Sequence, residues 1–194
     1  MSDAGVDAIL RGGAPLSQVN LRECVNVSGA AVAAIGMAPH ITGLHTLDVA
    51  CVGTILDQHL LPVLKQHTGV LTSLNCGGSN CMITDVCLQH LPPALTVLDL
   101  AECKMVWNLL PVSQLGHLSS LSLDGCDVQL DALVDVCRAC PLTALNVAAS
   151  SIDDAMLANI VSSLPRLLHL ELRACSAVTD DGVEAVVDHC KQLV

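Results

Sequence analysis

The chain has 194 residues, of which 52% are hydrophobic, yet it contains one Trp and neither Tyr nor Phe. Its formal net charge is −11, with eight Lys and Arg against nineteen Asp and Glu, so it lacks the clustered basic residues that bind nucleic acid through phosphates. The longest weakly polar run, "GAAVAAIGMA", ends before Pro39 and is too short to span a bilayer, so we expect no membrane insertion.

The first ten residues, "MSDAGVDAIL", resemble a stretch near the C-terminus. Ser2 to Leu10 align with Thr179 to Val187 with mostly conservative changes. A chain that begins in the middle of the unit on which it ends is typical of a repeat array. We therefore predict that the first ten residues are the helical half of a repeat unit.

A Leu-x-x-Leu-x-Leu pattern recurs along the rest of the chain. It starts at residues 16, 44, 71, 95, 118, 142 and 167, and we expect an eighth copy to begin at Leu193. The alternation of apolar and polar residues predicts a short strand in each unit. Eight residues after each start lies a position predicted to face inward from a turn, occupied by Cys24, Val52, Ser79, Cys103, Cys126, Ser150 and Cys175.

The second half of each unit has helical periodicity. Val183, Val186, Val187 and Cys190 fall at i, i+3, i+4 and i+7, which predicts one apolar face of a short helix. Side chains that can cap free amides precede such helices, at Ser28, Thr84, Asp153 and Thr179. Prolines that end a helix follow at Pro39, Pro92, Pro141 and Pro165.

The units resemble leucine-rich repeats, in which such a strand is followed by Asn or Cys. With the elements "TDDGV" and "HCKQL" they are similar to the cysteine-containing subclass, best known from the substrate-recognition arms of F-box leucine-rich-repeat proteins. The implied fold is α/β: a solenoid arc of about seven strand-turn-helix units, with a parallel concave sheet and helices on the convex side. We expect residues 1–194 to be a single leucine-rich-repeat domain that starts and ends mid-repeat, its ends covered by neighbouring subunits.

Eleven cysteines raise the question of metal or redox chemistry. No signal peptide pattern opens the chain, so we expect reduced thiols and an intracellular, most simply cytoplasmic, protein. Cys137 and Cys140 have the spacing of a zinc-binding pair, but Cys76, Cys81 and Cys87 do not provide a second pair. We interpret the cysteines as small core residues and expect no metal and no cofactor.

The histidines have a similarly structural interpretation. His40, His67 and His189 each lie four residues before a strand start, which is a repeated turn position. No nucleophile is placed with a His and an acid by any motif, so we expect no enzymatic activity. A thiol- or metal-dependent enzyme is kept as an alternative of a different class.

The concave face carries the candidate binding residues. Strand side chains alternate between core and surface, so two rows are predicted to face outward. One is Asn20, Asp48, Asn75, Asp99, Ser122, Asn146 and Glu171, and the other is Arg22, Ala50, Gly77, Ala101, Asp124, Ala148 and Arg173. These rows predict a shallow, acceptor-rich groove with an Arg near each end, although a solvated strand row is polar in any case.

Trp107 is the sole aromatic residue, and it aligns with Thr179 at a helix-start position. Trp is enriched among binding hot spots, yet it can equally fill a gap in the convex layer. The leading hypothesis is a non-enzymatic scaffold that binds a protein partner on its concave face, as a subunit of a larger assembly. The alternative is a substrate-recognition component of a ubiquitin ligase that acts with an adaptor chain, since no F-box is present in this sequence.

Overall fold

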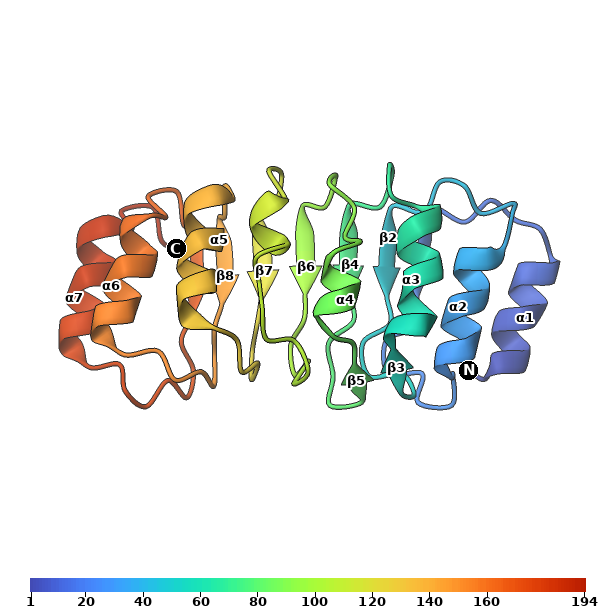
Figure 1. The fold of residues 1–194 in the computed structure, drawn as a ribbon, viewed down its shortest axis with the longest axis horizontal. Coiled ribbons are helices and arrows are strands. Elements are labelled where there is room, and N and C mark those ends of the chain that lie inside the picture. The colour runs from blue at the N-terminus through green and yellow to red at the C-terminus, as the bar shows by residue number, and fades with distance from the viewer.

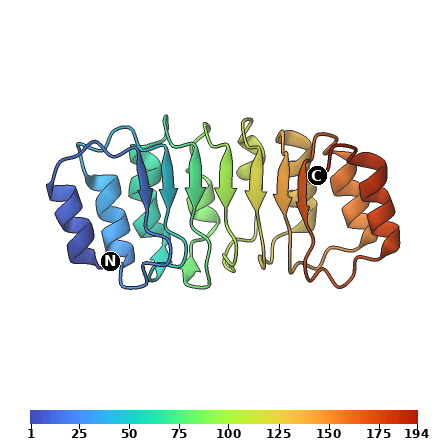
Figure 2. The ribbon, with the colours of Figure 1, turned by 180° about the vertical axis from the view of Figure 1, so that it is seen from behind.

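Seven strands form one parallel sheet in the computed structural model, which describes residues 1–194 (Figure 2). They lie side by side in chain order, as β1 (Gln18–Asn20), β2 (Thr46–Asp48), β4 (Ser73–Asn75), β6 (Val97–Asp99), β7 (Ser120–Ser122), β8 (Ala144–Asn146) and β9 (His169–Glu171). Every pair keeps the same register, with the middle residue of one strand opposite the middle residue of the next. The predicted strand of each unit is confirmed.

Helices and turns cover the other side of the sheet (Figure 1). They are α1 (Asp3–Arg11), α2 (Gly29–Met37), α3 (Asp57–Gln66), α4 (Asp85–Leu88), the 3-10 helix η1 (Val112–Gln114), α5 (Leu130–Ala139), α6 (Asp154–Ser162) and α7 (Asp180–His189). A two-stranded sheet of β3 (Ile55–Leu56) and β5 (Cys81–Met82) lies at one edge. The fold is the predicted α/β leucine-rich-repeat solenoid, and the sheet surface away from the helices is called the concave face.

The core is one continuous apolar cluster of 51 buried residues. Its centre is a row of inward strand leucines, of which Leu47, Leu74, Leu98, Leu121 and Leu145 are stacked in register. Because leucine is the same size in each unit, neighbouring strands can keep one spacing along the sheet. None of the helices is long and apolar enough to cross a membrane.

After each strand the backbone turns through a left-handed residue. The seven residues with this conformation are Glu23, Cys51, Gly78, Glu102, Gly125, Ala149 and Ala174, with φ between 52° and 134°. This region is costly for residues other than glycine. In all but the last unit the amide of this residue donates to a carbonyl of the following unit, at 2.7–2.9 Å, which extends the strand pairing through the turn and holds the strained backbone.

Aspartates at the starts of helices join neighbouring units. Asp3, Asp57 and Asp154 each accept the amide and the hydroxyl of a residue in the next unit, namely Ser28, Thr84 and Thr179, at 2.7–2.8 Å. These hydrogen bonds lower the pKa values of Asp3 and Asp154. Thr84, Asp153 and Thr179 also cap their own helices as predicted. The prediction for Ser28 was wrong, because its hydroxyl donates to Asp3 and does not cap α2.

The helical half is not the same in every unit, which corrects the expectation of one short helix per unit. The third unit has only the four residues of α4, and the fourth has only the three-residue η1. The fourth unit is also the shortest, with 23 residues between strand starts, and Pro111 precedes η1. The short connection, with a proline that lacks an amide hydrogen, leaves room for one tight turn.

Ser79 does not occupy the inward turn position, which is a second correction. It is exposed, whereas Cys81, two residues further on, is buried. Gly77 and Gly78 lead into this longer turn, and the φ of Gly78 is 134°, which side chains rarely tolerate. The other cysteines at this position behave as predicted: the Cys126 and Cys175 thiols donate to the carbonyl oxygens of Leu100 and Val147 at 3.0 and 3.3 Å.

Candidate functional site: the concave face

The predicted polar row lies on the concave face, but most of its members are bound to their own backbone. Six of the seven accept the amide hydrogen of the residue two positions later, at 2.9–3.1 Å: Asn20, Asp48, Asn75, Asp99, Asn146 and Glu171. Ser122 makes no such bond. Short polar side chains often accept such local amide hydrogen bonds, so this row helps to fold each strand end.

The local bonds change what the row can offer to a partner. Asp48 and Asp99 are only half exposed, not fully solvated as expected, and each commits one carboxylate oxygen to an amide. The second oxygen of Asp48 lies 3.4 Å from the side-chain amide of Asn75. The row can therefore accept hydrogen bonds from a partner, but with about half the acceptor capacity that the sequence indicates.

A hollow of about 280 Å³ opens in the concave face over β7, β8 and β9. Its floor is made of small side chains at Ser120, Ser122 and Ala144, and its walls include Asn146, His169, Glu171 and Val194. The amide of Val194 donates to the carbonyl oxygen of Leu168, which places the C-terminal residue beside β9 (Figure 2). This hollow is not the predicted groove. The small residues expected to face outward at Ala50, Gly77 and Ala148 are buried, because the chain turns directly after each strand, and none of them lines the hollow.

The two arginines follow the first and last strands of the sheet, but they do not flank the hollow: Arg173 is near it, two residues after β9, whereas Arg22 follows β1 at the opposite end. The Arg173 guanidinium reaches across the buried Ala148 and binds the Asp124 carboxylate, with 2.8 Å between Nη2 and Oδ2. Ala148 belongs to the unit between them, so its small side chain makes this contact possible. Arg22 lies 3.6 Å from the neighbouring Glu23 and has no partner in another unit. The Arg22 side chain is therefore available for an ion pair with a partner, whereas the Arg173 side chain is already paired with Asp124.

Trp107 is 52% exposed, in agreement with the half-exposed placement predicted for it. Its amide donates to Asp85 at 2.9 Å, as the amide of Thr179 donates to Asp154, so the alignment of the two positions is confirmed. No helix starts at Trp107, however, because this unit has only η1. Trp107 does not line the concave hollow, so the structure does not bring it together with the other predicted binding residues.

Nine of the eleven cysteines are buried, which agrees with their interpretation as core residues. Burial raises the pKa of Cys126 to about 11 and that of Cys137 to about 12, so both stay protonated at neutral pH. The structural counterpart of Cys190 in the fifth unit is Cys140. Cys140 and Cys190 directly follow α5 and α7, and their thiols donate to carbonyl oxygens of the preceding unit.

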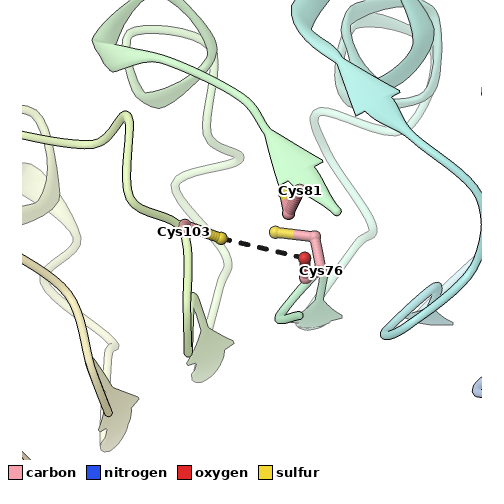
Figure 3. Close-up of side chains that lie close together, drawn as sticks. All are labelled: Cys76, Cys81 and Cys103. Atoms are coloured by element: carbon pink, nitrogen blue, oxygen red, sulfur yellow. Dashed lines mark hydrogen bonds between the residues drawn. The ribbon is translucent and has the colours of Figure 1, made fainter. Parts of the chain in front are cut away.

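One arrangement of cysteines was not predicted. The sulfur atoms of Cys76, Cys81 and Cys103 all lie within 4.8 Å of one another (Figure 3). Hydrogen bonds from the thiols of Cys103 and Cys76 lower the pKa of Cys81 to about 4. Spacing alone gave no signal for this group, because Cys103 belongs to the next unit and reaches the other two only when the units stack.

Of the three histidines predicted at a repeated turn position, His40 and His67 lie in turns, whereas His189 is the last residue of α7. His67 directly follows α3 and is fully buried, and neither of its ring nitrogens has a hydrogen-bond partner. Burial lowers the pKa of His67, so its ring is neutral in the folded protein. No nucleophile faces it, and it serves as a packed ring between units.

No protein-family model matches the chain. Among curated proteins it is similar to antagonist of mitotic exit network protein 1 of Candida glabrata, with 54% identity over 43 residues, which are 22% of this chain and 8% of that protein. Among solved structures it resembles one in the yeast Rad7–Elc1 complex, with a TM-score of 0.74 and 16% identity over 98% of this chain and 50% of that one. The C-terminal domain of Caenorhabditis elegans tropomodulin has a TM-score of 0.44 with 12% identity, over 99% of this chain and 93% of that one.

The chain thus spans about half the length of the Rad7–Elc1 structure's matching chain and less than a tenth of the curated relative. At 16% identity, the likeness to that structure shows the fold and not the function. The conclusion from the comparisons is that the chain shares the repeat-type α/β fold of a chain in the Rad7–Elc1 complex.

Proposed function

We propose that this chain is a non-enzymatic scaffold that binds a partner protein on its concave face, as a subunit of a larger assembly. The observation that carries the proposal is the hollow over β7, β8 and β9, which is lined by the small side chains of Ser120, Ser122 and Ala144 and by the polar side chains of Asn146, His169 and Glu171. A shallow, polar surface of this kind suits a protein segment, which can offer backbone amides and basic side chains along its length.

The charge of the chain supports the same class of partner. With a net charge of −11, long-range attraction favours a basic surface. Near the hollow, Glu171 uses one oxygen on the amide of Arg173 and leaves the other exposed. We therefore expect a partner whose contacting segment carries Lys or Arg and presents hydrogen-bond donors.

The second candidate is a substrate-recognition component of a ubiquitin ligase that acts with an adaptor chain. The observation that favours it is the fold likeness to a structure solved as a complex of Rad7 with Elc1. The alternative of a thiol-dependent enzyme has less support. The raised pKa values of Cys87, Cys126 and Cys137 make them poor nucleophiles, and Cys81, whose pKa is lowered, is only 4% exposed and out of reach of a substrate.

The test fills the hollow and leaves the rest of the protein unchanged. Ala144→Trp places a large side chain on the hollow's floor, whereas Ala155→Trp places the same side chain on an exposed position of α6. Each purified variant is immobilised, and proteins captured from the native source are quantified by mass spectrometry. We expect the principal partner to fall at least tenfold with Ala144→Trp and to be unchanged with Ala155→Trp.

Equal capture by the two folded variants would contradict binding of the partner in the concave hollow. The surface around Trp107 would then be the next candidate binding site. The identity of the captured partner separates the two candidates. A ligase adaptor among the proteins lost would favour the second, and its absence would favour a scaffold in another assembly.

A further inference from the structure

Three thiols from two neighbouring units lie close together in the interior of the solenoid, near the edge where β3 and β5 pair. Cys76 directly follows β4, Cys81 begins β5, and Cys103 follows β6 (Figure 3). Their sulfur atoms all lie within 4.8 Å of one another, and the three residues are 1%, 4% and 0% exposed. The group is therefore sealed from solvent on all sides.

Two departures from the repeat bring the three sulfurs together. Cys76 occupies the position at which the next two units have the buried leucines Leu100 and Leu123. The longer turn through Gly77 and Gly78 then places Cys81 beside it. In a unit built like its neighbours, only the cysteines of successive turns would lie near each other. A group of three sulfurs therefore requires both the cysteine at position 76 and the longer turn that places Cys81.

The thiols of this group are weakly bound to the surrounding backbone. The Cys103 sulfur lies 3.8 Å from the carbonyl oxygen of Cys76, whereas its counterpart Cys126 donates at 3.0 Å. Cys76 has a similarly long contact of 3.7 Å to the carbonyl oxygen of Asp99, and the Cys81 thiol donates to no carbonyl. The three sulfurs are therefore close to one another, and their contacts to backbone carbonyl oxygens are long.

We propose that Cys76, Cys81 and Cys103 form a binding site for one Cu(I) ion, held by the three sulfurs in a trigonal arrangement. Thiolates are soft ligands that select Cu(I). A metal–sulfur distance of about 2.3 Å corresponds to sulfurs about 4 Å apart around a central ion. The observed upper limit of 4.8 Å requires only a small contraction.

The number of ligands distinguishes Cu(I) from the other thiophilic metals. Structural zinc takes four protein ligands, and iron–sulfur clusters are commonly held by four cysteines. No His, Asp or Glu joins the three cysteines as a fourth ligand, and their burial leaves no place for the water that completes an open zinc site. Ligand thiols release protons when they bind a metal. Because the three cysteines are buried, we expect Cu(I) to enter, and the protons to leave, during folding or when the exposed turn at Ser79 and Asn80 opens.

The experiment titrates Cu(I) into the anaerobic, reduced protein in competition with bicinchoninate, both on the folded chain and during refolding from denaturant. Cys24 and Cys51, the two cysteines that are not buried, are replaced by Ser in every sample, so that surface thiols do not bind the ion. We expect one equivalent of Cu(I), a rise in the thermal midpoint and an ultraviolet sulfur-to-copper charge-transfer band.

Cys76→Leu is the main variant, because Leu fills the same position in the next two units, and Cys81→Ala is used if it does not fold. We expect either variant to weaken Cu(I) binding by at least about 100-fold. Loss of a group that only hydrogen-bonds to a ligand costs up to about 100-fold in metal affinity, and loss of a direct ligand should cost more. Cys126→Ala, a turn cysteine outside the group, is the matched control and should bind one equivalent. Undiminished binding in the folded variants, no binding even on refolding, or stoichiometric zinc in preference to Cu(I) would overturn the proposal.

Discussion

The sheet side and the helical side of this solenoid are built under different constraints. On the sheet side, seven strands of equal length keep one register, although their starts are 23 to 28 residues apart in the chain. On the helical side, α3 and α5 have ten residues, α4 has four, and the fourth unit has only η1. The variation in unit length is thus taken up outside the strands, on the convex side and in the turns that lead to it.

The reason lies in the bonds that join the units. The residue just before each of four strands has a hydroxyl that donates to a carbonyl oxygen of the preceding unit at 3.1–3.2 Å; these residues are Thr72, Thr96, Ser119 and Thr143. Backbone pairing, turn amides and thiols add further bonds on this side. Hydrogen bonds of Asp3, Asp57 and Asp154 join the starts of some helices to the next unit. Along their length the helices contact one another through side-chain packing, which tolerates elements of different length as long as the apolar volume is filled. Hydrogen bonds in every unit therefore fix the sheet, whereas packing accommodates different helix lengths.

The largest expected effect concerns the closest packing in the helical layer. A Cβ on Gly36 would lie 2.2 Å from the backbone nitrogen of Val63 in α3. Gly36→Ala gains about 1 kcal/mol of helix propensity, but the clash with backbone costs about 3 kcal/mol or more. We expect the free energy of unfolding in urea to fall by about 2 kcal/mol or more.

Gly69→Ala is the control, since nothing lies within 4 Å of a Cβ there. It should change stability by less than about 0.5 kcal/mol. If both variants were equally stable, the helical layer would have more freedom to shift than its packing indicates, and the contrast with the sheet side would be stronger.

A second prediction tests the thiol bond that joins two turns. Cys126 is buried and donates to Leu100 at 3.0 Å. Cys126→Ser keeps a donor and has a precedent in the half-buried Ser150, so we expect a loss below about 1 kcal/mol. Cys126→Asp buries an unpaired charge and should cost more than about 2 kcal/mol. Thermal unfolding measures both, and an Asp variant as stable as the parent would refute the inward placement.

The smallest effect tests the strand-end bonds of the concave row. Asp99→Ala removes the acceptor for the amide of Ala101, at a cost of about 1 kcal/mol. Ser122→Ala changes the equivalent position in the next unit, where no such bond exists, and should cost less than about 0.5 kcal/mol. Urea unfolding of the two variants distinguishes them. Equal stabilities would mean that the row is only a solvated surface, and its full acceptor capacity would then be available to a partner.

The candidate site was only partly predictable from the sequence. Alternation along each strand correctly placed Asp48, Asn146 and Glu171 on the concave face. It did not show that each would bind its own backbone, because that bond depends on how the chain turns after the strand. The ion pair of Arg173 with Asp124 was also missed, since it spans 49 residues and requires the small side chain of the unit between them.

What the sequence by itself determined is the repeat and its sheet. The Leu-x-x-Leu-x-Leu pattern is local, and each copy predicts the same strand whatever its neighbours do. Only the tertiary structure decided which helices would form in full, how closely α2 approaches α3 and that Cys103 meets Cys76 and Cys81. These features depend on contacts between units, where the shape and bonding of one side chain are matched by residues more than twenty positions away.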